Sequence, residues 1–227
     1  MKELLETARD AALDAGRLLR ERLGCVHEIR YKGEVNLVTE ADLAAEKIIL
    51  DAIRKRHPDH AILSEEGGGA EVARDRSVLW VVDTLDGTTN FAHGYPVFCV
   101  SIAALIDGVP CVGVIYDPML DEIFEAARGC GATINHRPMH VSVCTQLRRA
   151  LVVTGFVYDR GQALELPMRR FARMQMVCEG LRRDGSAALD MAHTACGRFD
   201  AFFELRLNPW DVAAGFVLIA EAGGRIT

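Results

Sequence analysis

The sequence predicts a mixed α/β protein in which helices are layered on sheets. Segments with the 3.6-residue apolar period of amphipathic helices are interleaved along the chain with short apolar or alternating segments typical of strands. Of the 227 residues, 50% are hydrophobic and 26% are charged, a composition typical of globular proteins and not of disordered chains. A chain of this length can form one large domain or two small ones.

Two helices and a series of strands are predicted in the N-terminal half. In chain order these are helices over residues 3–23 and 40–57, then strands over 61–63, 78–82, 97–106, 111–116 and 121–126. The first helix ends near Gly24, and Pro58 closes the second. The run 78–82 is apolar throughout, so we expect a strand that is buried on both faces and ends on Asp83. Turn residues separate the last three strands, which we interpret as an antiparallel meander.

The C-terminal half continues the alternation of strands and helices. We expect, in order, a strand over residues 150–154, helices over 163–178 and 186–196, a strand over 201–204 and a helix over 210–222. Gly223 and Gly224 end the last helix, as glycine does at many helix C-termini.

Charge and cysteine content argue against several classes of protein. Asp plus Glu is 32 and Lys plus Arg is 26, and the net charge of −6 disfavours a nonspecific nucleic-acid binder. The seven cysteines are scattered singly, which disfavours a disulfide framework and favours a reduced, cytoplasmic setting. We expect them to be buried as small apolar residues. No apolar run approaches the roughly 20 residues of a membrane span, and the N-terminus has no signal-peptide core.

Acidic residues are concentrated where the predicted strands end. Asp83 follows the buried strand, and Asp86 lies three residues later in a turn that Gly87 permits, before an expected helix start at residues 88–90. Two carboxylates at a strand end can share a hard cation, and the N–H groups of a helix start can hold a phosphate. The alternative is that these residues serve only ordinary turn chemistry. This alternative is weaker for Asp83, because an acid that ends an apolar strand needs a partner.

Two further acidic features could complete such a site. Glu65 and Glu66 are adjacent at the end of the strand 61–63, where like charges suggest a nearby cation, although a solvated loop is the alternative. Asp211 opens the last helix, where plain N-terminal capping is the alternative. No spacing rule shows that these places meet in space, so a carboxylate-rich magnesium site is a hypothesis at this point.

Five ordered motifs make the chain resemble the inositol monophosphatase family over nearly all of its length. Residues 80–91, WVVDTLDGTTNF, match the family pattern W-x-x-D-P-x-D-G-T-x-N-F except at Thr84, where proline is usual. Residues 208–215, NPWDVAAG, match W-D-x-A-A-G. Supporting matches are residues 36–42, 64–66 and 182–188. Five motifs in this order are far more specific than any single one.

The resemblance implies a layered α-β-α-β-α sandwich and a magnesium-dependent, lithium-sensitive phosphomonoesterase. The positions that match metal ligands are Glu65, Asp83, the backbone carbonyl of Leu85, Asp86 and Asp211. The positions that match phosphate and substrate contacts are Asp86, Gly87, Thr88, Thr89, Gly185, Ser186, Ala187, Glu204 and Asp211. Asp42, Thr88 and Glu65 match the catalytic positions, and Lys32 matches a basic residue near the metals.

The implied reaction is an in-line displacement assisted by two or three magnesium ions. One ion would lower the pKa of a water that Thr88 and Asp42 align, and a second would stabilise the leaving alkoxide. A third, weaker ion is expected near Glu65. Because no nucleophilic side chain is needed, we expect no covalent intermediate.

The expected substrate is a small polyol or sugar monophosphate, first of all myo-inositol 1-phosphate, with Glu204 suited to its hydroxyls. Fructose 1,6-bisphosphate, histidinol phosphate and 3′-phosphoadenosine nucleotides are alternatives, and a non-catalytic partner of the transcription machinery is the rival from another class. The resemblance implies a homodimer. It also implies a single domain over residues 1–227 that lacks the family's usual final strand and helix, so the last sheet has an uncovered edge.

Two other patterns are set aside. His136 and His140 have the spacing of metal ligands on a helix, but Pro138 between them disfavours a continuous helix. The glycines at 67–69 do not form a P-loop, because no Gly-Lys-Ser/Thr follows, and we expect a mobile loop beside Glu65.

Overall fold

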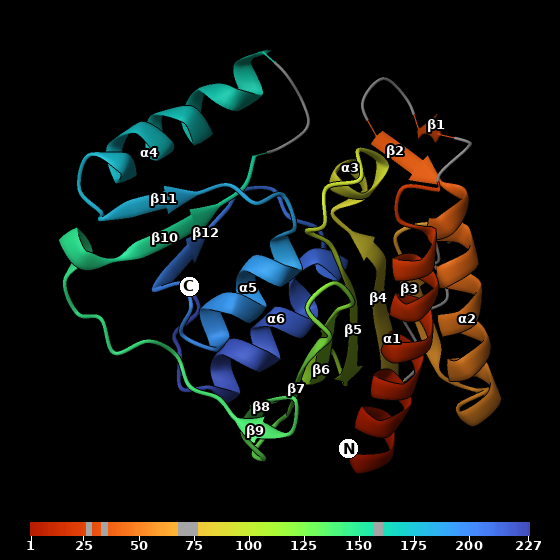
Figure 1. Ribbon diagram of the computed structural model, residues 1–227. Helices are drawn as coiled ribbons and strands as arrows, with labels where there is room; N and C mark the ends of the chain where they lie inside the picture. Colours follow the sequence, from red (N-terminus) through yellow and green to blue (C-terminus); the bar gives the residue numbers. More distant parts are fainter. Residues whose placement is uncertain (26–28, 33–35, 68–76, 157–160) are drawn as a thin grey trace.

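Five layers of helices and sheets follow one another across the structure (Figure 1), which is a computed structural model. The structure describes residues 1–25, 29–32, 36–67, 77–156 and 161–227. The layers are a helix pair, a large sheet, a second helix pair, a small sheet and a final helix. This is the expected α-β-α-β-α sandwich, and the prediction of a mixed α/β class is confirmed.

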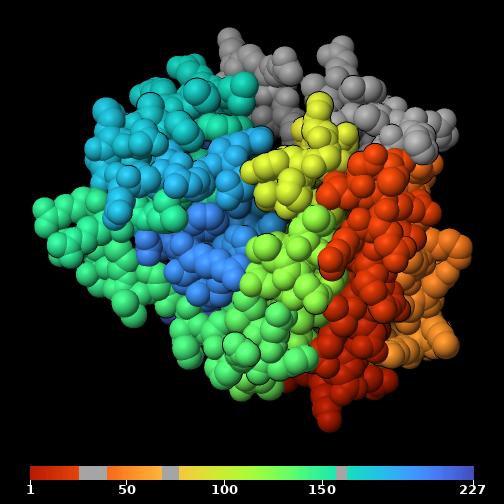
Figure 2. Space-filling model, in the orientation of Figure 1, coloured from red at the N-terminus to blue at the C-terminus, as the bar shows by residue number. Residues whose placement is uncertain are grey.

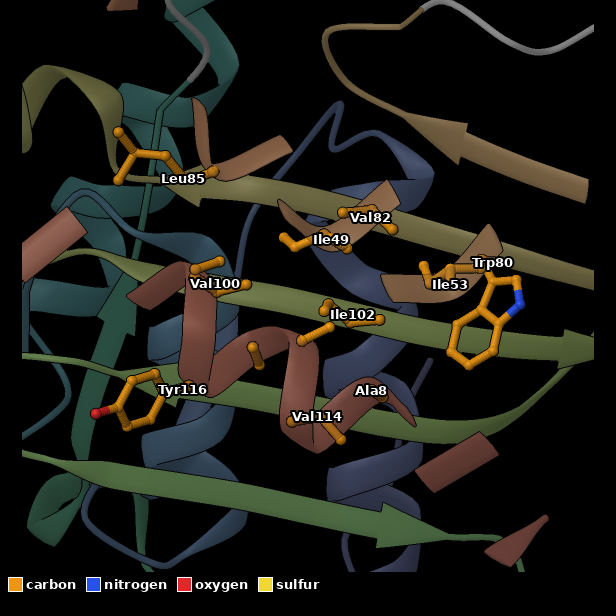
Figure 3. Close-up of a cluster of buried hydrophobic side chains, with 14 of the residues drawn as sticks. Ala8, Ile49, Ile53, Trp80, Val82, Leu85, Val100, Ile102, Val114 and Tyr116 are labelled. Atoms are coloured by element: carbon orange, nitrogen blue, oxygen red, sulfur yellow. The ribbon is translucent and has the colours of Figure 1, made fainter. Parts of the chain in front are cut away.

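The first layer consists of α1 (Lys2–Arg22) and α2 (Glu40–Arg56), which pack on each other and on one face of the large sheet. Small residues on α1 allow this close packing, among them the buried alanines Ala8, Ala11, Ala12 and Ala15. Figure 3 shows the resulting core, in which Ile49 and Ile53 of α2 lie over Trp80, Val82 and Ile102 of the sheet.

The large sheet has seven strands in the order β3-β4-β5-β6-β7-β8-β9. Their bounds are β3 Ala61–Ser64, β4 Val78–Asp86, β5 Cys99–Ile106, β6 Val109–Asp117, β7 Glu122–Ala127, β8 Ala132–Ile134 and β9 Arg137–Pro138. β3 and β4 are parallel, so their C-terminal ends lie at the same edge, and the other neighbours are antiparallel. The predicted meander from β5 to β7 is therefore confirmed.

The other face of the large sheet is covered by α5 (Ala187–Ala195) and α6 (Pro209–Glu221). Beyond α5 lies a parallel three-stranded sheet in the order β11-β10-β12, with bounds Gly180–Arg182, Leu151–Thr154 and Ala201–Phe203. The helix α4 (Glu165–Gln175) packs on β11 and forms the outermost layer (Figure 1). Among the described strands, none pairs with the outer edge of β12.

Two short elements complete the side of the fold where the acidic motif lies. A hairpin of β1 (Ile29–Lys32) and β2 (Asn36–Thr39) precedes α2, and α3 (Thr88–Ala92) follows β4. In the view of Figure 2, the yellow segment that contains α3 lies at the surface between the red N-terminal helix and the blue C-terminal half. None of the helices in the described ranges has the length and apolar character that a membrane span requires.

Several sequence predictions need correction. The strand predicted over 78–82 does not end on Asp83, because pairing with β5 resumes at Asp86 after an irregularity in the register. The helix predicted over 163–178 is shorter, since a 3₁₀ turn over Gly161–Leu164 precedes α4. The strands β1, β2, β8, β9 and β11 were not predicted, because two to four residues carry no clear period.

The cysteine predictions have a mixed outcome. All seven cysteines, each of which lies in a described range, are free, so the prediction that they form no disulfide framework is confirmed. Cys99 and Cys111 are buried, but Cys25, Cys130 and Cys144 are exposed, so the expectation of burial is wrong for these three.

Candidate active site

One pocket of about 380 Å³ gathers the ends of elements that are far apart in the chain. The C-terminal ends of β4 and β12 meet there with the N-terminal ends of α3, α5 and α6. The predicted site residues that line it are Glu65, Asp83, Leu85, Asp86, Gly87, Thr88, Thr89, Gly185, Ser186, Ala187, Glu204 and Asp211. The fold thus brings together Glu65, Asp83, Asp86 and Asp211, although no spacing rule could show that these acids meet in space.

The turn between β4 and α3 is held by short local hydrogen bonds. The Leu85 N–H donates to Asp83 Oδ1 at 3.1 Å, and the Thr88 hydroxyl donates to the Leu85 carbonyl at 3.0 Å. Gly87 has a φ of 98°, and a Cβ at this position would lie 2.9 Å from the carbonyl oxygen of Val97. Only glycine meets both conditions, so the turn of the first motif depends on Gly87.

Asp86 is fixed by the start of α5. Its Oδ2 atom accepts a bond of 2.6 Å from the Ser186 hydroxyl and one of 2.7 Å from the Ala188 N–H. Burial raises the pKa of Asp86, while these bonds oppose that shift because they stabilise the charged form. The contact joins the first motif to the motif over 182–188, 100 residues further along the chain.

Asp211 has both of the roles that the sequence left open. It occupies the third position of α6 in a capping box, where its Oδ2 accepts from the Asn208 N–H at 2.6 Å. It also lines the pocket, and burial raises its pKa to about 6. On the β3 side, the Glu65 N–H donates to the Val82 carbonyl at 3.3 Å, which ties the end of β3 to β4.

The acidic residues of the pocket repel one another strongly. Burial raises the pKa of Asp83 well above its ordinary value, and the charges of Glu65, Asp86 and Asp211 raise it further. Oxygen donors of this kind suit magnesium, and a bound cation would relieve the repulsion, so the residues present fit a divalent metal. In the described ranges, no group of three Asp, Glu, His or Cys side chains lies close enough together to hold a metal ion. Asp86 and Asp211 each direct one carboxylate oxygen toward a hydrogen-bond donor of the protein.

The predicted water-aligning pair lies at the margin of the pocket. Asp42 is 2% exposed in the first turn of α2, and its Oδ1 is 3.5 Å from the Thr88 hydroxyl, which is long for a hydrogen bond. Thr88 lines the pocket, whereas Asp42 contacts it through Thr88. Lys32 lies in β1, and its side chain is outside the described part of the structure, as are residues 68–69 of the glycine loop.

Sequence reasoning missed several pocket residues. Asp190 and Gly155 line the same pocket and belong to no pattern that we interpreted as functional, and Arg183, which lies in the matched motif over 182–188, was given no role in the site. Asp190 has the clearest signal in retrospect, because it is an acid in the first turn of a largely apolar helix.

Two residues that the sequence analysis did consider have clear outcomes. Burial raises the pKa of Glu204, a predicted site residue, to about 8. His136 precedes β9, so the expectation that it does not share a helix with His140 is confirmed.

Comparison with known proteins shows the family and the fold of the chain. The profile of the inositol monophosphatase family matches residues 1–227. An inositol-1-monophosphatase from Synechocystis is 49% identical over 224 residues, which cover 98% of this chain and 78% of that protein. The Nus factor SuhB from Escherichia coli K12 is 43% identical over all of this chain and 85% of its own length.

The solved structures lead to the same result. The inositol monophosphatase from Anabaena sp. PCC 7120 is 48% identical and superposes with a TM-score of 0.89, over 99% of this chain and 83% of that one. The predictions of the fold class and of a phosphatase are thereby confirmed. The sequence profile, the identity to these relatives and the shared fold show that the chain belongs to the inositol monophosphatase family.

Proposed function

We propose that the chain is a magnesium-dependent phosphomonoesterase that acts on a small polyol or sugar monophosphate, first of all myo-inositol 1-phosphate. The observation that carries the proposal is the convergence of four carboxylates with the turn before α3 and the first turns of α5 and α6 in one pocket. Carboxylates suit a hard cation, and backbone N–H groups suit a phosphate. The Synechocystis and Anabaena relatives, both named as inositol monophosphatases, support this substrate.

In the proposed mechanism the chain's own groups bind and orient the reactants. Two or three Mg²⁺ ions would be held by Glu65, Asp83, the Leu85 carbonyl, Asp86 and Asp211. When bound, Mg²⁺ supplies positive charge that activates water and stabilises the leaving oxygen.

The remaining residues position the water, the phosphate and the alcohol. The Thr88 hydroxyl orients the water, and the neighbouring Asp42 carboxylate accepts a proton from it. The backbone of Gly87, Thr88 and Thr89 contacts the phosphate. Gly185, Ser186, Ala187 and Glu204 contact the alcohol, and Glu204 binds its hydroxyls.

A panel of phosphate esters tests the substrate and the metal. Phosphate release is measured from myo-inositol 1-phosphate, fructose 1,6-bisphosphate, histidinol phosphate and a 3′-phosphoadenosine nucleotide, with and without Mg²⁺ and with added Li⁺. We expect the fastest release from the inositol ester, dependence on Mg²⁺ and inhibition by Li⁺. No release from any of the four esters would refute the proposal.

A second candidate function is binding to the transcription machinery. The specific observation is the 43% identity to a relative that is named a Nus factor. An Asp86→Asn variant separates the two functions, because it removes a proposed metal ligand. A cellular phenotype that survives this substitution while hydrolysis is lost would favour the binding role.

We further propose that the chain forms one domain over residues 1–227, assembles as a homodimer and acts in the cytoplasm. Its seven free thiols support a reducing compartment. Light scattering of the purified protein measures the mass, and a monomer at micromolar concentration would refute the dimer.

A further inference from the structure

Asp190 lies in the pocket and has no part in the mechanism above. It is 2% exposed, and it lines the same pocket as Asp86 and Glu204. Its Oδ2 atom is buried and has no hydrogen-bond partner. Buried polar atoms are nearly always paired, so a free carboxyl oxygen beside a ligand pocket calls for an explanation.

A purely structural role does not account for this side chain. The hydrogen bonds that tie Asp190 to its helix use its backbone, since its N–H donates to Ser186 and its carbonyl accepts from the Thr194 hydroxyl. An acid in the first turn of a helix is stabilised there mainly when it is ionised. Ionisation is disfavoured here, as the surroundings of the carboxyl show.

Burial and the neighbouring acids disfavour ionisation of the Asp190 carboxyl. Burial, followed by the charges of Asp184, Asp86 and Glu204, raises its pKa to about 9, against a smaller opposing effect of Arg183. A neutral carboxyl offers one O–H donor and retains acceptor capacity. Because burial also raises the pKa of Glu204 to about 8, the pocket contains two carboxyl groups that can both donate and accept.

The chemistry of two such groups matches a polyhydroxylated alcohol. Each hydroxyl of a polyol donates one hydrogen bond and accepts others, so it pairs well with a group that does the same. A phosphate would pair instead with N–H groups and cations, and an apolar alcohol would leave Oδ2 unpaired.

We propose that Asp190 is a specificity-determining residue that binds a hydroxyl group of the substrate alcohol, together with Glu204. The proposal rests on the phosphatase function above and deepens it. It names phosphate monoesters of alcohols with at least two further hydroxyls as the preferred class.

The test compares two esters in two variants. The esters are myo-inositol 1-phosphate and phenyl phosphate, whose leaving group has no further hydroxyl, both assayed with Mg²⁺. Asp190→Leu keeps the branched shape, with methyl groups larger than the oxygens they replace, but cannot form hydrogen bonds, whereas Asp190→Asn retains a donor and an acceptor. We expect the leucine variant to lower kcat/KM for the inositol ester about tenfold more than for phenyl phosphate, mainly through KM. The asparagine variant should restore most of the preference, and Glu204→Gln is the matched comparison at the other carboxyl.

Other results would overturn the proposal. Equal losses on the two esters, or an asparagine variant as poor as the leucine variant, would show that Asp190 only supports the fold. Thermal melting by circular dichroism checks that the variants are folded. If the wild type hydrolyses neither ester, the phosphatase function fails by itself, and calorimetric titration of the wild type and Asp190→Leu with free myo-inositol still decides the role of Asp190. Equal affinity in the two proteins would then refute it.

Discussion

Replacing Gly155 with alanine should weaken substrate binding through Glu204 while the fold is retained. A Cβ at position 155 would lie 2.2 Å from Glu204 Oε2 and 2.3 Å from Oε1, whereas ordinary van der Waals contact begins at 3.4 Å. The Glu204 carboxyl would therefore have to move by about 1 Å. Because it is the end of a flexible side chain, it can move at little cost to the backbone.

The expected loss follows from that displacement. Hydrogen bonds have their heavy atoms 2.7–3.2 Å apart, so a shift of about 1 Å breaks them. A neutral hydrogen bond contributes about 0.5–1.5 kcal/mol, and a carboxyl that contacts two hydroxyls makes about two. Together these contribute about 1–3 kcal/mol, so kcat/KM for myo-inositol 1-phosphate should fall roughly fivefold to 150-fold. Phosphate-release kinetics measure the loss, and a thermal melt should show almost no change.

A double-mutant cycle identifies the route of the effect. In a Glu204→Ala background there is no carboxyl to displace, so Gly155→Ala should have little further effect on kcat/KM. An equal loss in both backgrounds would show that the added methyl group acts on something else. Full activity of the single Gly155→Ala variant would refute the assignment of Glu204 to the substrate.

Three further substitutions test the rest of the site and the core. Asp83→Asn should lower turnover at least about 100-fold, because it removes a proposed metal ligand. It should leave Tm unchanged or higher, because burial and the neighbouring acids disfavour the ionised form of this carboxyl, and Asp107→Asn in an exposed turn is the control. Ser186→Ala removes the 2.6 Å donor of Asp86 and should lower turnover about tenfold without weakening α5, which that hydroxyl does not cap. Normal turnover in either variant would contradict these roles. Burial lowers the pKa of His193 from 6.5 to about 4, so the unfolded state takes up its proton first as the pH falls. The His193 contribution to stability is full above pH 6.5 and should be lost toward pH 4, by up to about 3 kcal/mol. In urea unfolding the wild type should therefore lose more stability over this range than a His193→Phe variant, and the same change in both proteins would refute this cause.

The long elements could be predicted from the sequence because their burial is periodic. The buried residues of α1 recur at helical spacing from Leu4 to Leu19, and the interior of β4 is apolar up to Asp83. The short strands β8, β9 and β11 could not be predicted from the sequence. Each is defined by pairing with a neighbouring strand over only two or three residues, which is too short for a period to show. The end of β4 was misplaced for a similar reason, because its last residue is fixed by Cys99 on the neighbouring strand.

The site residues also differ in whether the sequence could predict them. Residues within a motif could be named from the sequence, because Gly87 and its neighbours form one local turn. Asp190 and Gly155 could not, since their relation to the pocket exists only after α5 packs on β4 and the small sheet of β10 and β12 packs on α5. Glu204 could be named from the family resemblance. Only the structure shows that its carboxyl lies against Gly155, so that residue 155 must be small.

The way in which each acid is held explains how the fold tolerates four of them in one pocket. Asp211 is fixed by the capping box of α6, and Asp86 by the Ser186 hydroxyl and the Ala188 N–H. These bonds let helix starts stabilise the two charges, so capping and ligand binding are compatible roles of one carboxylate. Asp83 is different, because it receives a bond from the Leu85 N–H but is buried among three other acids that raise its pKa. Of the proposed ligands, Asp83 is therefore the one whose charge should depend most on a bound cation.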